Sequence, residues 1–261
     1  MAGSPDTRIQ SADVVGVAHS LENCSCRTCV ILVGKPGMGK GTNAEMFVNQ
    51  HPESRKIGTG DIFRDLSKPD SKFAEKYPEG REIKEVMAAG DLVRDELVLS
   101  IVTQETERMF GEEGAEVVIY DGAIRNREQD LYFRRRILPS LGENTNVLYI
   151  DVRGEDDTYR QRVQIRREQA LIQGKAIRED DTEEAVEKRL ATYYRTTHPL
   201  VEDLEASGEL HVIDAERPLE EVYADFEQTI FVAMNRSNNP GVEISDKAKY
   251  YPSINSTGPV L

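Results

Sequence analysis

The sequence lacks a long apolar segment, and this absence excludes several classes of protein. No apolar run approaches the roughly 20 residues that a membrane-spanning helix requires. The first 28 residues contain neither the apolar core of a secretory signal nor the Arg-rich, acid-poor composition of a transit peptide. We therefore expect a cytoplasmic protein that makes no membrane contact.

Basic side chains are also scarce relative to acidic ones. The chain has 33 Lys and Arg residues against 47 Asp and Glu residues, which gives a formal net charge of −14. Surfaces that bind nucleic acid carry clustered Lys and Arg, because their ligand is a polyanion. The charge balance therefore argues against a nucleic-acid partner and confines any phosphate chemistry to a local basic pocket.

Cysteine is the third scarce residue type, and its three copies lie together at Cys24, Cys26 and Cys29. A closed zinc site needs four ligands, and the nearest histidine in the sequence, His19, completes no standard spacing. We expect no tightly bound metal at these thiols. An odd, clustered set of thiols fits a reducing compartment better than a secreted protein.

The length of 261 residues permits one medium-sized domain with inserted lobes, because such a chain buries a full core without disulfides or metals. Both ends are polar or rich in Pro, Ser and Asn. They predict a flexible N-terminal extension over residues 1–27 and a C-terminal tail over residues 236–261. The domain itself is expected over residues 28–235.

Short apolar runs rich in branched residues alternate with long charged stretches of helical periodicity. The runs cover residues 30–33, 117–120, 147–150 and 210–213. This alternation predicts an α/β fold, in which a parallel sheet has helices on both faces and binds ligands at the carboxyl ends of its strands. Asp121, Asp151 and Asp214 follow three of the runs, and the neighbourhood of Asp121 favours a functional role.

The first run leads directly into a glycine-rich loop, GKPGMGKGT, at residues 34–42. The spacing G-x-x-x-x-G-K, with a hydroxyl in the Gly41-Thr42 step, predicts a phosphate-binding loop. Its backbone N–H groups and Lys40 would hold a polyphosphate, and a helix beginning near Lys40 would add its positive end to the same anion. The alternative is a plain glycine-rich turn, which the strand before it and the helix after it disfavour.

Further motifs follow the loop in a fixed order. They are the segment 56–64 (KIGTGDIFR), the segment 89–96 (AGDLVRDE), the segment 121–125 (DGAIR) with Gln129 four residues later, the arginines 162, 166 and 167, and the segment 178–190 with Arg178, Asp180, Asp181 and Arg189. This set resembles the adenylate kinase family of nucleoside monophosphate kinases over about residues 28–230. Phosphoryl transfer needs positioned cations, which supports the same chemistry independently. Most arginines of any chain are in surface ion pairs, and only their place in a matched motif favours a role.

The resemblance implies a P-loop NTPase-type fold with a five-stranded parallel sheet flanked by helices. An acceptor-binding lobe would span about residues 57–93, and a short lid about residues 160–182. The lid contains no Cys or His, which excludes the zinc-bearing lid of some family members. The implied reaction is the reversible Mg²⁺-dependent transfer of a phosphoryl group from ATP to AMP, giving two ADP. ATP and AMP would be the partners, and the protein would be a monomer.

The resemblance also implies roles for individual residues. The catalytic set would be Lys40, Arg125, Arg166, Arg178 and Arg189. The ATP-binding residues would be Gly37, Met38, Gly39, Lys40, Gly41, Thr42, Arg162 and Arg166. The AMP-binding residues would be Thr59, Gly60, Arg64, Gly90, Leu92, Val93, Gly122, Arg125, Gln129, Arg178 and Arg189. Asp121 would hold magnesium through water, and Asp180 and Asp181 would orient the lid arginines.

The resemblance further implies that the acceptor is AMP and not UMP or CMP. Thr59 stands where adenylate kinases commonly have threonine, and Gln129 matches a glutamine whose amide pairs with the adenine edge.

Three departures from the family pattern leave alternatives open, and the first is a segment between Arg64 and Gly90 that is longer than in short family members. Ala123-Ile124 stand where the family usually has Phe-Pro with a cis peptide. A non-proline cis bond costs about 2.5–4 kcal/mol. Either the loop bears this strain, or the backbone reaches Arg125 by another path. Arg94 adds charge near the acceptor site. The alternatives are a kinase for another nucleoside monophosphate and a catalytically weak nucleotide-binding regulator.

Overall fold

The computed structural model describes residues 27–66, 68, 71, 73, 77, 86–87 and 91–236. Nearly all of the two predicted terminal extensions lies outside the described residues, and so do Cys24, Cys26 and Gly90. No helix in the described part of the chain is both long enough and apolar enough to cross a membrane.

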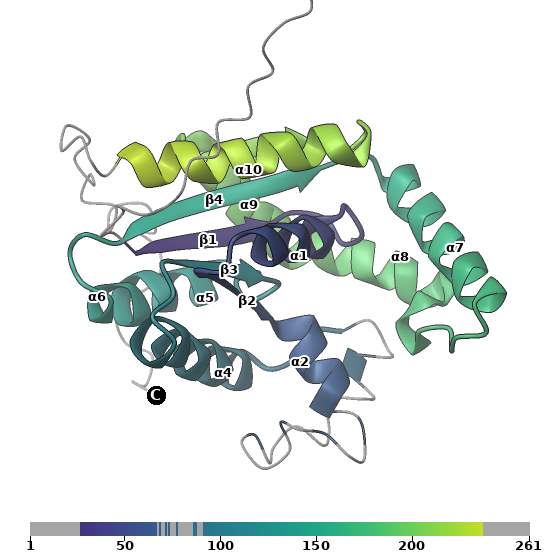
Figure 1. Ribbon diagram of the computed structural model, residues 1–261. Helices are drawn as coiled ribbons and strands as arrows, with labels where there is room; N and C mark the ends of the chain where they lie inside the picture. Colours follow the sequence, from purple (N-terminus) through teal and green to yellow (C-terminus); the bar gives the residue numbers. More distant parts are fainter. Residues whose placement is uncertain are drawn as a thin grey trace, which may run out of the picture.

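The core of the molecule is a five-stranded parallel sheet with the order β2-β3-β1-β4-β5 (Figure 1). The strands are β1 (Thr28–Val33), β2 (Ser54–Gly58), β3 (Val117–Asp121), β4 (Asn146–Arg153) and β5 (Leu210–Asp214). All six residues of the central strand β1 are buried, which explains its uninterrupted apolar sequence. The predicted parallel five-stranded sheet is confirmed.

Helices connect successive strands. They are α1 (Lys40–Gln50), α2 (Thr59–Leu66), α4 (Asp95–Glu107), α5 (Arg127–Tyr132), α6 (Leu138–Ser140), α7 (Asp156–Ile172), α8 (Glu183–Thr192), α9 (His198–Ala206) and α10 (Leu219–Arg236). Three π-helical segments, η2 (Arg108–Glu112), η3 (Phe133–Ile137) and η5 (Tyr193–Thr197), and a short 3-10 helix, η4 (Glu179–Asp181), continue or link them.

Side chains alternate across the sheet and form a separate apolar core on each face. Cys29, Ile31 and Val33 of β1 pack with residues of α2, α4, η3 and α9. Val30 and Leu32 point to the opposite face and pack with residues of α1, α7, α8 and α10. Figure 1 shows α10 lying along one side of the sheet, and α4, α5 and α6 on the other. The sheet is thereby fixed from both faces, as a parallel sheet requires.

The strands end where the chain turns into α1, α2, α5 and α7, and this edge carries the motifs that the sequence predicts to be functional. Beside it, α7 and α8 extend away from the sheet (Figure 1). Only Tyr159 and Val163 of α7 are buried, four residues apart on its first turns, and the rest of the helix is polar or exposed. The buried side chains of the helix are therefore confined to its N-terminal half, and most of its length lies in the segment predicted as the lid, residues 160–182.

Candidate active site

The phosphate-loop sequence forms a tight turn between β1 and α1. Gly34, Gly37 and Gly39 all have positive φ, and at two of them a side chain would collide with a neighbour. A β-carbon on Gly34 would lie 1.9 Å from Asp151 Oδ1, and one on Gly37 would lie 2.2 Å from the ring of Tyr159. Glycine is required here by both backbone conformation and space.

The two lysines of this loop face different partners. Lys40 Nζ donates to the carbonyl oxygen of Gly34 at 2.9 Å and also to that of Lys35. Burial lowers the pKa of Lys40 to about 8, and Arg125 and Arg189 act in the same direction while Asp121 and Asp151 oppose it. An anion beside this amine would therefore bind most strongly to its protonated form.

Lys35 ties the loop to the helix that follows β4. Its Nζ donates to the carbonyl oxygen of Gly154 at 3.0 Å and lies 2.7 Å from Asp156 Oδ1, in the first turn of α7. Tyr194 donates to the same Asp156 oxygen from η5 at 2.9 Å. The contacts join the loop to both ends of the α7–α8 segment, and nothing in the sequence pattern had pointed to them.

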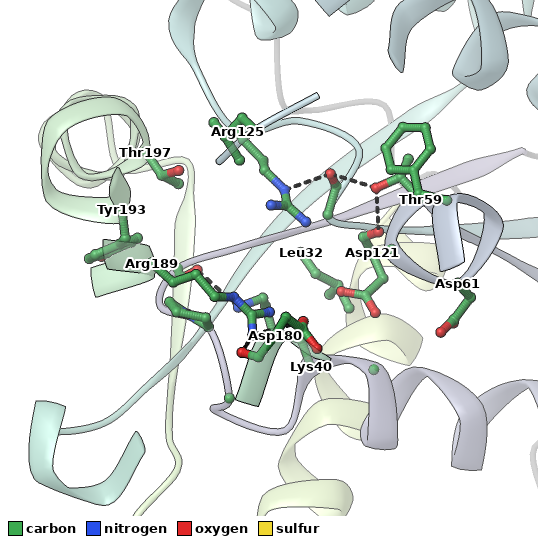
Figure 2. Close-up of a pocket in the computed structure, with 18 of the residues that line it drawn as sticks. Leu32, Lys40, Thr59, Asp61, Asp121, Arg125, Asp180, Arg189, Tyr193 and Thr197 are labelled. Carbon is green, nitrogen blue, oxygen red and sulfur yellow. Dashed lines mark hydrogen bonds and ion pairs between the residues drawn. The ribbon is translucent and has the colours of Figure 1, made fainter. Parts of the chain in front are cut away.

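Asp121, the last residue of β3, stands next to the start of α1. A β-carbon on Gly41 would lie 2.8 Å from Asp121 Oδ2, and Thr42 follows on the same helix. Asp121, Gly41 and Thr42 all line the same cavity. Figure 2 shows the carboxylate of Asp121 turned towards the middle of this cavity.

The carboxylate of Asp121 and the hydroxyl of Thr42 fit a magnesium ion that is bound mainly through phosphates and water. In the part of the chain that the structure describes, no three His, Cys, Asp or Glu side chains gather as a ready-made metal cage. Mg²⁺ keeps several waters and uses few protein carboxylates when it accompanies a nucleotide. One carboxylate beside the phosphate loop meets that requirement.

Arg125 reaches the cavity without a cis peptide. The described residues contain only trans peptide bonds, so of the two paths expected from Ala123-Ile124 the structure takes the trans one. Arg125 Nε donates to the carbonyl oxygen of Gly122 at 2.8 Å, and Thr59 Oγ1 donates to the same oxygen at 2.8 Å. Ala123 and Ile124 are buried in the core and anchor the turn that carries Arg125. The guanidinium points into the cavity in Figure 2.

Burial and neighbouring arginines lower the pKa of two arginines at the cavity, Arg125 and Arg178. Burial lowers the pKa of Arg125, and Arg189 and Arg64 contribute in the same direction. Burial, followed by Arg64, also lowers the pKa of Arg178. Cations that are buried close together without full compensation form a strong site for a polyanion.

Arg64 comes from α2, five residues after Thr59. Its Nη2 donates to Asp61 Oδ1 at 2.5 Å, and Asp61 Oδ2 accepts from Lys56 at 3.1 Å. Lys56, Asp61 and Arg64 all line the cavity beside Gly60. Of these, sequence reasoning named only Arg64 and Gly60. The carboxylate of Asp61 is a charge partner for both cations, and its position three residues before Arg64 was the available signal.

Gln129 is buried, at 2% exposure, and lines the same cavity. Its side-chain oxygen accepts the backbone N–H of Arg125 at 2.6 Å, and its Nε2 donates to Asp95 Oδ1 at 2.9 Å. Leu92 and Val93 also line the cavity, whereas Arg94 is exposed and does not. The extra charge expected from Arg94 is therefore absent from the cavity wall.

The lid arginines pair with two adjacent carboxylates. Arg166 on α7 makes a two-pronged contact with the buried carboxylate of Asp181, with Nε at 2.8 Å from Oδ2. Burial alone would lower the pKa of Arg166, but its hydrogen bonds to Asp181 outweigh this and raise it. Asp180 lies 3.0 Å from Arg189 Nη1 and 3.6 Å from Arg178 Nε. Figure 2 shows Asp180 and Arg189 side by side near Lys40.

The motifs thus converge on one cavity of about 410 Å³, within the range of nucleotide-sized sites. Most predicted residues line it. The lining ones are Gly37, Gly39, Lys40, Gly41, Thr42, Thr59, Gly60, Arg64, Leu92, Val93, Asp121, Gly122, Arg125, Gln129, Arg166, Arg178, Asp180 and Arg189.

Three predicted residues differ. Met38 belongs to the loop, but its side chain is buried in the core and does not line the cavity. Arg162 does not line the cavity and instead donates to the carbonyl oxygen of Ala215 at 2.5 Å. Asp181 is held behind Arg166. The cavity wall also includes Met87, Val98, Tyr193 and Thr197, which carried no motif signal because they occur within ordinary helical sequence.

Comparison with known proteins agrees with this geometry. The adenylate kinase family model matches residues 32–209. An adenylate kinase of Acidothermus cellulolyticus is 35% identical over an alignment of 216 residues that covers 75% of this chain and 94% of the relative. One of Leuconostoc mesenteroides is 33% identical over 201 residues (77% and 96%), and one of Brucella ovis is 33% identical over 204 residues (78% and 99%).

The matched residues include the glycine-rich loop, Arg64, Arg125 and Asp180, which line one cavity. This chain belongs to the adenylate kinase family.

Proposed function

We propose that this protein is an ATP:AMP phosphotransferase, which transfers the terminal phosphoryl group of ATP to AMP reversibly and gives two ADP. The observation that carries the proposal is the gathering of Lys40, Arg64, Arg125, Arg178 and Arg189 around one cavity beside a phosphate loop. A single phosphate loop serves one nucleotide. Arg64 on α2 and Arg125 on the turn after β3 would supply a second anion-binding site for the other nucleotide.

In the proposed reaction, an oxygen of the AMP phosphate attacks the terminal phosphorus of ATP, and the bridging oxygen leaves with ADP. Negative charge spreads over the equatorial oxygens of the transferred group, so positioned cations supply most of the catalysis. Lys40 and the loop backbone would hold the donor phosphates, while Arg64 and Arg125 would hold the acceptor phosphate. No general base is needed, since the acceptor phosphate is already an anion at neutral pH.

The arginines of the α7–α8 segment would act on the transferred group. Arg166 is oriented by Asp181, and Arg178 and Arg189 are oriented by Asp180. The carboxylates also offset the mutual repulsion of the arginines before nucleotide binds. Arg162, which now contacts Ala215 beside the loop, would contact the donor from the same helix. Movement of α7, whose buried residues are Tyr159 and Val163, would close the site and exclude water.

Magnesium would enter with ATP. Asp121 and Thr42 would face its hydration shell, and the ion would neutralise charge on the donor phosphates.

AMP is the proposed acceptor because Thr59 and Gln129 stand on the acceptor side, next to Leu92 and Val93. An amide presents both a donor and an acceptor to the adenine edge. We also propose that the protein acts as a cytoplasmic monomer that binds no nucleic acid, in keeping with its negative charge. Sedimentation equilibrium of the full chain tests the oligomeric state.

The deciding experiment measures ADP formation from MgATP with AMP, dAMP, UMP, CMP or GMP as acceptor, each against an acceptor-free control. Fast turnover confined to AMP and dAMP is the expected result. Preference for another acceptor would overturn the adenine assignment, and the absence of turnover with every acceptor would identify a nucleotide-binding regulator.

A further inference from the structure

Asp95, the first residue of α4, accepts a hydrogen bond from the side-chain amide of Gln129. Gln129 Nε2 donates to Asp95 Oδ1 at 2.9 Å, while Gln129 Oε1 accepts the backbone N–H of Arg125 at 2.6 Å. Asp95 itself does not line the cavity, whereas Gln129 does. We propose that Asp95 is a positioning residue that makes the acceptor site selective for adenine over 6-oxopurines. The inference rests on the proposed function and adds the group that sets its base specificity.

The two contacts leave the amide only one orientation. A backbone N–H can only donate, and an ionised carboxylate can only accept. Rotating the amide of Gln129 by half a turn would set its NH₂ group against the N–H of Arg125 and its oxygen against Asp95. Both hydrogen bonds would then be lost at a buried side chain, which is costly.

The carboxylate is fixed in turn by a second amide. Asn126 Nδ2 donates to Asp95 Oδ2 at 2.9 Å, and Asn126 Oδ1 accepts the backbone N–H of Gln129 at 2.8 Å, which caps the start of α5. Each oxygen of Asp95 therefore accepts from one amide. Asp95 cannot rotate away from Gln129 without also losing its hydrogen bond to Asn126. Helix α4 and the turn before α5 therefore hold the side-chain amide of Gln129 together.

The remaining hydrogen-bonding capacity of Gln129 defines the base it can accept. A primary amide has two N–H donors and two oxygen lone pairs. One donor is used by Asp95 and one lone pair by Arg125, so one of each is left for a ligand in a fixed order. Adenine offers an acceptor at N1 beside a donor at the 6-amino group. Hypoxanthine and guanine offer a donor at N1 beside an acceptor at O6, which is the reverse order.

The test compares Asp95→Asn and Asp95→Ala with wild type, using AMP and IMP as acceptors with MgATP. Asp95→Asn keeps the shape but must turn a donor towards one of the two amides, and Asp95→Ala removes both contacts. We expect the ratio of kcat/KM for AMP to that for IMP to fall about tenfold, mainly through a higher KM for AMP, with kcat at saturating AMP little changed. Glu96→Gln is the matched control, because it removes an exposed charge from the same first turn of α4 and should keep the wild-type ratio.

The outcomes separate this inference from the proposed function. A wild-type protein that does not phosphorylate AMP overturns the proposed function. If wild type prefers AMP and the folded variants keep its AMP to IMP ratio within twofold, Asp95 does not set the base specificity. Equal losses for AMP and IMP would also overturn the inference, since they would give Asp95 a structural role only. Should thermal melting show that Asp95→Ala is unfolded, Asp95→Asn alone decides.

Discussion

Lys40 Nζ donates a hydrogen bond of 2.9 Å to the carbonyl oxygen of Gly34, six residues earlier in the same loop. The ammonium group thus lies over the loop and is held by backbone oxygens. A polyphosphate can replace these oxygens as the partner of the ammonium group. The side chain is therefore placed to bind ligand at little cost to the fold.

Lys40→Met should lower turnover by at least about a hundredfold, because it removes a cation that faces the transferred charge. The midpoint of thermal unfolding should change by only a few degrees, since the methionine keeps the apolar stem. Initial rates of ADP formation and a thermal melt check both parts. Lys175→Met, which removes an exposed ammonium in the turn after α7, should leave turnover unchanged.

Nucleotide binding should take up protons above pH 8. Because burial lowers the pKa of Lys40 to about 8, much of this amine is neutral at pH 8.5 before the nucleotide binds. A bound triphosphate favours the protonated form and raises the pKa, so the affinity for ATP should fall as the pH rises above 8. Calorimetric titration at pH 8.5 in buffers of different ionisation enthalpy measures the uptake. The uptake should disappear in Lys40→Met, and its persistence there would assign it to another group.

Arg125→Ala should weaken the use of AMP with little change in ATP binding. The variant would remove the proposed charged contact to the acceptor phosphate, worth about 1.5–3 kcal/mol, which corresponds to roughly 10- to 150-fold in kcat/KM for AMP. Steady-state kinetics with each substrate varied in turn separates the two nucleotides. Arg55→Ala, an arginine of β2 paired with Glu113, is the control. Unchanged AMP kinetics in Arg125→Ala would show that this arginine does not hold the acceptor.

Asp180→Asn should slow phosphoryl transfer about tenfold. The carboxylate lies 3.0 Å from Arg189 and 3.6 Å from Arg178, so its neutralisation leaves two close cations with weaker orientation. Single-turnover measurements with saturating nucleotides report the chemical step. Asp157→Asn removes a carboxylate that pairs with Arg160 on the exposed side of α7 and should have no effect on that step. Equal rates in the two variants would contradict the role given to Asp180.

Gly34→Ala should damage the protein far more than Gly114→Ala. Both glycines have positive φ, +96° at Gly34 and +65° at Gly114, so alanine strains both backbones. A β-carbon at residue 34 would also lie 1.9 Å from Asp151 Oδ1, whereas one at residue 114 would meet no atom within 4 Å. We expect about 1 kcal/mol of destabilisation for Gly114→Ala and several times that for Gly34→Ala, together with loss of ATP binding. Urea unfolding and ATP titration measure these effects.

The sequence predicted most of the sheet because buried parallel strands are continuous runs of branched apolar residues. Four such runs correspond to β1, β3, β4 and β5. The apolar pattern did not reveal β2, because this edge strand has the sequence SRKIG and places Arg55 and Lys56 where they are partly exposed. Two charged residues in the middle of β2 interrupt the apolar run, so the strand gives no continuous apolar signal.

The candidate site was predicted where a motif has a chemical reason for its spacing. Gly39 and Lys40 belong to such a motif, and the structure places both at the cavity. Asp95 was not predicted, because it acts through Gln129, a side chain from a different helix. Asp61 was not predicted either, although its position three residues before Arg64 on the same helix was a signal in the sequence. Hydrogen bonds between residues 34 positions apart leave no pattern in one sequence.

By itself the sequence determined the alternation of strands and helices, the phosphate loop and the positions of arginines within matched motifs, since these depend on local spacing and composition. Tertiary structure alone decided the trans path that brings Arg125 into the cavity, the burial of the Met38 side chain and the single orientation of the Gln129 amide. These features depend on which atoms meet when distant segments pack, and the direction of a hydrogen bond is set only when both partners are in place.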